Sequence, residues 1–487
     1  MTISEHLLTD EFKLSFAHGL NRVNQEWINT TYHFFQTSGE EIVPTLVAIN
    51  LTNLATASML GPRISKSQSM LVNEHTALRQ NWIQLRLEQD PLFSSLDGQA
   101  PESGHTANNK QLLLLEKQLL DTSRLVSLTC ESQDIKCEPF MDDYYSYFDN
   151  LTIARDEIAQ VQYFQANEEI HAVVFDSSGT RVNHCLASMG FLRRLLKAWR
   201  MAIRGRGVTE NTLAQKTMLV TFYEKLVRPL ELENINQLYF VPLPELHDLP
   251  LHACHDGSSF LAQKTRISYI NFPFSIDDEY FSGFFNVPNK QPSALVGSYS
   301  MHQKLPHTRD ECLKVADLLR KQDAEVYCFP ETLSSRELEI EGKYADIIHL
   351  SAHGDYRKDN SIFSSIHLSD GPLSALQVGT MAFEKRPLLV LNACSTGSGS
   401  RRAGALQGIV RSFLMSGARF VIANQWEIED EDASIFMQEF YERLRVGNVN
   451  PGKTLQETQS KLINQGASIN EWGSYVCWQD HQRGKGE

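Results

Sequence analysis

The sequence predicts an α/β protein in which a mostly parallel sheet carries helices on both faces. Apolar runs of strand length alternate with segments of helical spacing through residues 291–487, and this alternation is typical of a parallel sheet. Two of the apolar runs end in reactive side chains, at His353 and Cys394. Because substrates bind beyond the carboxyl ends of parallel strands, this pair predicts a site at one edge of the sheet.

The composition limits the class of protein. With 487 residues the chain is too long for one hydrophobic core, so we expect two to four domains. The net charge of −14 argues against a general nucleic-acid binder. The chain has no apolar stretch of about 18 residues, so we expect no membrane span. The eight cysteines form no disulfide framework and the start of the chain lacks signal-peptide features, which favours the cytoplasm.

Residues 1–150 are expected to form a helical region. Apolar side chains such as Leu8, Phe12 and Phe16 recur at helical spacing, and residues 93–109 are rich in small and polar residues typical of a surface loop. No clean repeat of about 34 residues is visible, so tetratricopeptide-like repeats and an irregular helical bundle both remain open. The segment offers no evident chemistry, and we expect it to bind a partner or sensor.

Residues 155–290 mix strands and helices. Apolar runs at 170–175 and 182–186 flank a turn and predict a hairpin, and residues 237–242 predict a further buried strand. A helix is expected at 191–203, with apolar residues on one face and basic residues on the other. Its basic face is compatible with anionic lipid or a partner, although a core-facing helix with a solvated side explains the same pattern.

Residues 291–487 are expected to alternate strand and helix with short connections, as a parallel sheet requires. The strands are expected at 294–298, 325–329, 346–351, 388–393 and 418–424, and the helices at 308–321, 404–417, 430–445 and 452–465.

The joint placement of His353 and Cys394 indicates a nucleophile pair. Taken singly, the cysteine is more often a core thiol and the histidine more often structural. A thiolate is the attacking species, so a neighbouring histidine must lower the thiol pKa or accept its proton. The tetrahedral oxyanion then needs donors, for which the backbone N–H groups of Gly354 and Cys394 are the candidates.

Metal and nucleotide chemistry are not expected. His247, His252, Cys254 and His255 lie close together in the sequence, but their spacing fits no standard zinc pattern. No phosphate-binding glycine loop is present, which argues against a flavodoxin-like nucleotide binder with the same alternating pattern. We therefore expect no cofactor and no metal.

Several ordered motifs give the chain a specific resemblance. They lie at residues 349–354 (HLSAHG), 391–397 (LNACSTG), 408–414 (GIVRSFL) and 417–423 (GARFVIA). With these motifs, residues from about 155 to 480 resemble the CHAT domain, a caspase-like protease domain related to caspases and separase. The resemblance implies an active caspase-like domain at 291–487 and an inactive caspase-like half at 155–290.

The resemblance also implies roles for individual residues. His353 is implied as the general base and Cys394 as the nucleophile, and Asn392, two residues before the cysteine, as a wall of the substrate pocket. Acidic residues that relatives use to bind Arg or Lys are missing beside Ser298 and after Cys394, which weakens a preference for basic substrate residues. The implied or candidate pocket residues are Ser298, Asn392, Gln425, Trp426, Glu427, Glu429 and Asp430, of which the three acidic ones also fit a negatively charged helix N-terminus.

The function that follows is a cysteine endopeptidase acting on a protein substrate. The resemblance implies a place in bacterial defence or signalling, where family members act beside gasdermin-like pore formers or CRISPR effectors, and an activating partner or signal. The alternative is a non-catalytic caspase-like adaptor with a helical docking surface. An intact His353–Cys394 pair argues against that alternative, because a scaffold requires neither residue.

Overall fold

The computed structural model describes most of the chain from Asn150 onward. The described ranges are 150–204, 209–243, 246–247, 249–271, 273–276, 291–300, 307–355, 363–393, 408–426, 428–446 and 450–480. Before Asn150 it describes only scattered, mostly helical positions between residues 25 and 118. The expected loop at 93–109 and the helical spacing of Leu8, Phe12 and Phe16 lie outside the described residues.

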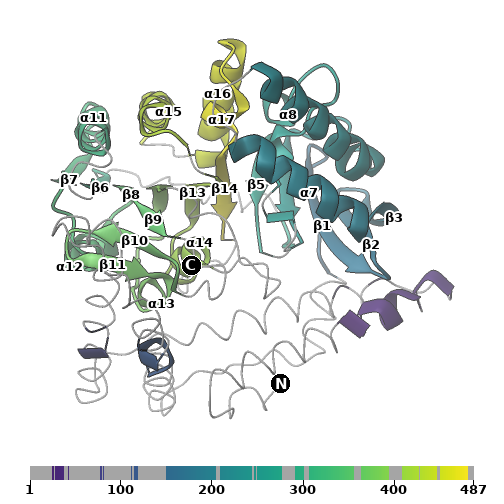
Figure 1. Cartoon of the computed structure of the whole chain (residues 1–487), viewed down its shortest axis with the longest axis horizontal. Helices are drawn as coiled ribbons and strands as arrows, with labels where there is room; N and C mark the ends of the chain where they lie inside the picture. The colour runs from purple at the N-terminus through teal and green to yellow at the C-terminus, as the bar shows by residue number, and fades with distance from the viewer. Residues whose placement is uncertain are drawn as a thin grey trace, which may run out of the picture.

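A sheet of eleven strands forms the centre of the described structure (Figure 1). Its order is β3-β2-β1-β4-β5-β14-β13-β12-β8-β6-β7. The strands are β1 (Ile158–Ala166), β2 (Glu169–Asp176), β3 (Gly179–Ser188), β4 (Gln237–Val241), β5 (Arg266–Tyr269), β6 (Ser293–Tyr299), β7 (Glu325–Phe329), β8 (Ile347–Ala352), β12 (Leu388–Asn392), β13 (Phe420–Asn424) and β14 (Tyr475–Gln479).

The sheet is mostly parallel and runs through both expected regions. Strands β6, β7, β8, β12 and β13 are parallel to their neighbours in that group, as are β1, β4 and β5 in theirs. β14 lies between the groups, antiparallel to β13 and parallel to β5. The predicted α/β class is therefore confirmed, whereas the division of the chain at residues 155 and 291 stays a prediction.

The predicted strands are confirmed, and their ends agree with the expected ones to within three residues. In 291–487 every expected strand is present, and β2 and β3 form the expected antiparallel hairpin. The inner strands form because most of their side chains are apolar and buried, as in β12, whereas the edge strands β3 and β7 are partly exposed. Sequence patterning missed β1, β5 and β14, and it missed the antiparallel direction of β14.

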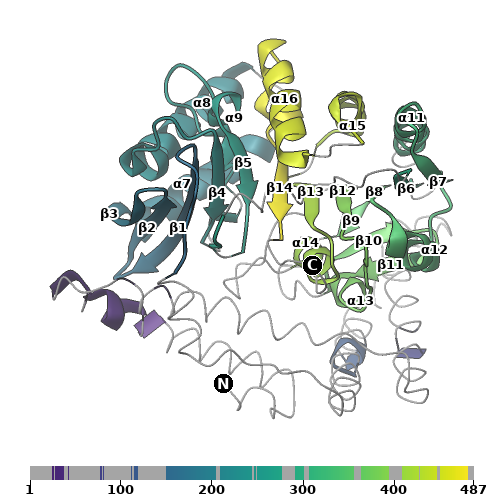
Figure 2. The ribbon, with the colours of Figure 1, turned by 180° about the vertical axis from the view of Figure 1, so that it is seen from behind.

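Helices cover both faces of the sheet (Figures 1 and 2). α11 (Thr308–Arg320), α15 (Asp430–Arg443) and α16 (Pro451–Asn464) lie on one face, and the shorter α12 (Ser335–Glu341), α13 (Ala375–Val378) and α14 (Ile409–Met415) lie on the other. α7 (Met189–Arg204) and α8 (Thr209–Phe222) pack on each other. The remaining helical elements of the described chain are short. They are α9 (Leu261–Lys264), α17 (Ile469–Trp472), a π-helical turn (Tyr223–Val227) and three 3-10 turns (Arg228–Leu230, Leu251–Ala253, Gly342–Tyr344).

The predicted helices are confirmed, with ends set by local chemistry. α16 begins where Asn450 accepts a hydrogen bond from the N–H of Lys453 and where Pro451 occupies the first position. The expected helix at 404–417 is observed as α14, and residues 404–407 lie outside the described part of the chain. The expected helix at 191–203 is α7, whose apolar side includes the fully buried Trp199.

A second, three-stranded sheet follows β8. It contains β9 (Gly354–Asp355), β10 (Ser365–Leu368) and β11 (Gly371–Ser374), in the order β11-β10-β9. Because β9 begins two residues after β8 ends, the intervening His353 sits where the chain passes from one sheet to the other. In the part of the chain that the structure describes, every helix is too short or too polar to cross a membrane.

Helical positions before Asn150 contact the sheet, among them Gln25, which donates to the carbonyl of Gln165 on β1. Tyr32 is buried, and its hydroxyl lies 2.9 Å from Nδ1 of His171 on β2 and also contacts His184 on β3. Burial raises the pKa of Tyr32 and lowers the pKa of both histidines. The N-terminal region therefore packs on the β2–β3 hairpin through uncharged polar groups.

Candidate active site

His353 occupies the carboxyl end of β8. The strand ends at Ala352, and His353 follows with its side chain half-buried. Its carbonyl oxygen accepts a hydrogen bond from the N–H of His367 on β10, at 2.8 Å, and the two imidazole rings lie 5.5 Å apart. The backbone of His353 is thus held while its ring remains accessible in part to solvent.

The strand that leads to Cys394 lies beside β8. β12 ends at Asn392, which pairs with Ser351 in parallel register, and Ala393 beyond it is buried. His353 and Cys394 each follow a member of this pair by two residues in the sequence. Cys394 itself, with residues 395–407, lies outside the described residues, so its place in the site stays a prediction.

The pairing of β9 with β10 determines the direction of the Gly354 backbone N–H. Gly354 on β9 stands opposite Ile366 on β10. Because the N–H of His367 donates to His353, this pair is of the non-hydrogen-bonded type, in which each N–H points away from the partner strand. The N–H of Gly354 therefore points away from β10, and its oxyanion role stays a prediction.

A buried carboxylate holds the last residue of β12. Glu311, in the first turn of α11, is almost fully buried. The side-chain amide of Asn392 donates to both of its oxygens, at 2.8 and 2.9 Å. From the other side, the hydroxyl of Tyr475 on β14 donates to Oδ1 of Asn392 at 2.8 Å. The side chain of Asn392 is therefore engaged within the fold, and its role as a pocket wall stays a prediction.

The same carboxylate binds a histidine inside the sheet. Nε2 of His349, on β8, lies 3.0 Å from Glu311 Oε1, and the hydroxyl of Tyr441 lies 3.2 Å from His349 Nδ1. A carboxylate only accepts, so Nε2 of His349 carries the proton and Nδ1 accepts from Tyr441. Burial, with a further contribution from the Glu311 charge, raises the pKa of Tyr441 well above its usual value and keeps that hydroxyl a donor.

Ser298 lies on β6, the neighbour of β8 on the side away from β12. It is buried on β6, pairs with Ser351, and its hydroxyl accepts the N–H of Glu331 at 3.2 Å. Ser298, Ser351 and Asn392 thus lie side by side across three neighbouring strands. The structure brings the predicted Ser298 and Asn392 to the same edge of the sheet as His353.

The expected pocket residues after β13 make contacts between distant segments. The amide of Gln425 donates to the carbonyl of His247 at 2.9 Å. Trp426 is buried and meets Trp199 of α7 edge to face, with ring centroids 5.9 Å apart. Both side chains therefore pack against residues of 155–290. Glu427 lies outside the described residues, so the pocket role of all three stays a prediction.

Asp430 begins α15 and lies close to the start of α11. Its Oδ2 accepts the backbone N–H of His307 at 2.7 Å. Burial raises the pKa of Asp430, the Glu311 charge adds to this rise, and the hydrogen bond from His307 opposes it. Two carboxylates thus approach the same end of the sheet, although neither is shown to face a substrate.

Sequence patterning missed Glu311, Tyr475 and His367. From the sequence alone, Glu311 is a favourable acidic residue in the first turn of a helix, and the local pattern does not indicate that it is buried. The available signal was His349, a polar residue inside an apolar strand, since a buried imidazole requires a partner.

The structure also describes the four residues that were considered for zinc and judged not to fit. Of these, His252 makes hydrogen bonds to the carbonyl of Gly473 and the hydroxyl of Tyr269. Within the described ranges, no group of His, Cys, Asp and Glu side chains is arranged to hold a metal.

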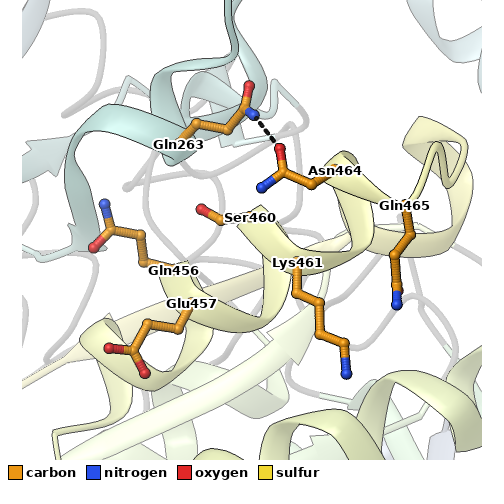
Figure 3. A pocket seen from close by; sticks show the side chains of 7 residues that line it. All are labelled: Gln263, Gln456, Glu457, Ser460, Lys461, Asn464 and Gln465. Atoms are coloured by element: carbon orange, nitrogen blue, oxygen red, sulfur yellow. Dashed lines mark hydrogen bonds between the residues drawn. The ribbon is translucent and has the colours of Figure 1, made fainter.

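A polar surface pocket lies away from these residues, between α9 and α16 (Figure 3). Gln263 on α9 donates to Asn464 on α16 at 3.2 Å and closes one side. The other lining residues are Gln456, Glu457, Ser460, Lys461 and Gln465. Since Lys461 binds Glu439 and the pocket contains none of the predicted site residues, it plays no part in the candidate active site.

Comparison with solved structures gives distant similarities. Two crystal structures of the Saccharomyces cerevisiae separase–securin complex match with TM-scores of 0.49 and 0.46 and identities of 11% and 10%, each match covering 96% of this chain. This chain spans 44% of those separase chains. A complex of the pro- and mature domains of Porphyromonas gingivalis RgpB matches with a TM-score of 0.35 and 10% identity, covering 60% of this chain and 76% of that one.

At the sequence level no curated protein matches the chain. The model of the CHAT domain family matches residues 216–480, which is more than half of the chain. That range contains His353, Asn392 and Cys394 together with β6, β8, β12 and β13 of the parallel group. The chain therefore belongs to the CHAT domain family.

Proposed function

We propose that the protein is a cysteine endopeptidase that cleaves a protein substrate with Cys394 as nucleophile and His353 as general base. One observation carries the proposal: the parallel pairing of Asn392 with Ser351, from which Cys394 and His353 are each two residues away. From this register we expect both residues to lie at one edge of the sheet. His353, half-buried at that edge, has the exposure that a base acting on a bound substrate needs.

The reaction follows the general course of thiol acyl transfer. His353 accepts the thiol proton, and the Cys394 sulfur attacks the carbonyl carbon of the scissile peptide. The N–H groups of Gly354 and Cys394 stabilise the oxyanion, and protonated His353 returns the proton to the leaving amine. Water then releases the acyl group. The proposal needs both side chains on rigid elements, and the buried strands β8 and β12 that precede them support this.

Variants of the two residues test the proposal. Cys394→Ala and His353→Ala should each abolish cleavage, and the double variant should be no worse than either, because the pair acts as one unit. Cys185→Ala, at an exposed thiol of β3, serves as the matched control and should retain full activity. Cleavage is read by N-terminal peptide mapping of a proteome digested with the purified chain. Full activity of the folded Cys394→Ala chain would favour another nucleophile.

We further propose that a partner or signal controls the activity, within a bacterial defence or signalling system that supplies the substrate, such as a gasdermin-like effector. The helical positions before Asn150 contact the sheet through Tyr32, His171 and His184, so this region is coupled to the fold. The described cysteines Cys185, Cys254, Cys312, Cys328 and Cys477 are thiols, which fits the reducing cytoplasm.

A truncated chain tests whether residues 1–150 control the activity or only stabilise the fold. The full chain should cleave slowly alone and faster with the product of a neighbouring gene, whereas a chain starting near Asp143 should not respond to that partner. Full activity of the intact chain without any partner would contradict regulation while leaving the dyad in place. A chain that binds the partner and never cleaves, even with intact His353 and Cys394, would favour the adaptor alternative.

A further inference from the structure

Two thiols face each other on the α11 side of the sheet, outside the candidate dyad. Cys312 is fully buried on α11, and Cys328 is half-buried on β7. Their sulfur atoms lie 3.8 Å apart. β7 is the last strand of the sheet, so Cys328 lies at an edge that small solutes can reach, and Cys312 lies directly behind it.

The surroundings make the two sulfurs chemically different. A hydrogen bond from Cys312, helped by the nearby Arg320 guanidinium, lowers the pKa of Cys328 to about 7, with burial and Asp317 opposing. The contact with Cys328, together with burial and the Glu311 charge, raises the pKa of Cys312, against a weaker opposing hydrogen bond from Ser298. Cys328, which is the less buried thiol and lies near Arg320, therefore ionises more readily than Cys312 behind it.

We propose that Cys328 and Cys312 form a peroxide-sensitive dithiol that closes reversibly to an intramolecular disulfide. The Cys328 thiolate attacks one oxygen of hydrogen peroxide, the O–O bond breaks, and hydroxide leaves, so that Cys328 becomes a sulfenic acid. Cys312 then attacks that sulfur, the S–O bond breaks, and the departing oxygen leaves as water with the Cys312 proton. In total two thiols are oxidised, and one peroxide is reduced to two waters.

Closing this bond requires the two sulfurs to approach each other. A disulfide is about 2.0 Å long, so the gap closes by roughly 1.8 Å, and we expect α11 to shift as it does. The shift reaches the candidate site, because Cys312 follows Glu311, the carboxylate that holds Asn392. Ser298, which contacts Cys312, belongs to the same edge of the sheet.

The proposal does not depend on peptidase activity, and its test uses the full chain with Cys394→Ala. After brief treatment with hydrogen peroxide, free thiols are alkylated and the chain is digested with trypsin. Cys312 then lies in peptide 310–314 and Cys328 in peptide 322–336. We expect these two peptides as one linked species, lighter by two hydrogen atoms than the sum of the reduced peptides, which dithiothreitol converts back to both free peptides.

Two variants and an internal control sharpen the test. Adding Cys312→Ser should stop the reaction at sulfenic acid on Cys328, trapped by dimedone, and adding Cys328→Ser should leave Cys312 a free thiol. Cys185 is exposed, but its hydrogen bond to Glu169 raises the thiol pKa, so it should react at least several-fold more slowly than Cys328. Equal rates at Cys185 and Cys328, or oxidation of Cys328 without the linked species, would overturn the proposal.

Discussion

Asn392 is fixed from two directions, by Glu311 on α11 and by Tyr475 on β14. The residue lies two positions before Cys394, so the segment expected to carry the nucleophile begins at a residue whose side chain is fixed. The anchor is polar and buried, and an unsatisfied group there costs about 1–3 kcal/mol. We therefore expect Glu311 to act as a positioning residue for the proposed site, through Asn392.

Replacing Glu311 by Gln tests this role. The N–H group of the new amide would face the N–H groups of Asn392 and His349, which now donate to the carboxylate. We therefore expect a loss of about 1–3 kcal/mol in the free energy of unfolding, measured in urea. Cleavage should fall in kcat more than it rises in KM. Asp310→Asn, exposed in the same helical turn, is the matched control and should change stability by less than about 0.5 kcal/mol. Equal effects of the two variants would contradict the buried role of Glu311.

At the scale of elements, α7 is attached to the end of β13 by aromatic packing. Trp199 is fully buried and meets both Trp426 and Phe222 edge to face. Arg193, Arg194 and Lys197 of α7 are exposed, so the pattern that suggested a lipid or partner surface coexists with a core-facing side. Trp426 reaches this core from the segment expected to border the substrate.

Removing the Trp199 ring should open a cavity between α7 and the sheet. Trp199→Ala is expected to lower the free energy of unfolding by about 3–5 kcal/mol. Met201→Ala lies on the same helix, and its side chain is 69% exposed, so that variant should stay within about 0.5 kcal/mol of the parent. Denaturant unfolding followed by circular dichroism compares them. A Trp199→Ala chain as stable as Met201→Ala would show that α7 is not anchored by this ring.

At the scale of the molecule, stability should fall in mild acid. His252 lies buried between Tyr269 of β5 and Gly473 beside β14. Burial lowers its pKa from 6.5 to about 4 in the folded state, so only the unfolded chain takes up a proton between these values. Stability contributed by neutral His252 is therefore complete above pH 6.5 and is lost as pH falls toward 4, by roughly 3 kcal/mol in all.

His252→Gln isolates this contribution. Between pH 7 and pH 5 the parent should lose about 2 kcal/mol more than the variant in urea unfolding, because Gln does not titrate. The variant should be less stable at pH 7, since it makes poorer hydrogen bonds to Gly473 and Tyr269. Identical pH dependence of the two chains would mean that another group, such as His171 or His255, carries the acid sensitivity.

The elements that the sequence predicted are those whose information is local. Strands such as β12 and β8 are mostly apolar and are buried on both faces, and a short window shows that pattern. β14 was missed because its neighbours, β13 and β5, lie far away in the sequence and its direction depends on both. Local pattern contains no such information.

The residues of the candidate site also differ in whether the local sequence pattern predicts them. His353 was predictable because the end of an apolar run marks the end of a strand. The burial of Glu311 was not, because it depends on His349 and Asn392, which belong to two strands far along the chain. The contacts of Gln425 and Trp426 with residues of 155–290 were likewise hidden, since they join segments about 180 and 230 residues apart in the sequence.

The position of β14 has a consequence for synthesis of the protein. The strands β1–β5 and β6–β13 are all made before residues 475–479, yet the sheet is continuous only when β14 fills the space between β5 and β13. Domains fold from the N-terminus as the chain leaves the ribosome. During most of translation the two strand groups therefore remain unjoined, and Tyr475, which anchors Asn392, is absent. We therefore expect the eleven-stranded sheet to stay incomplete on the ribosome until β14 has been made.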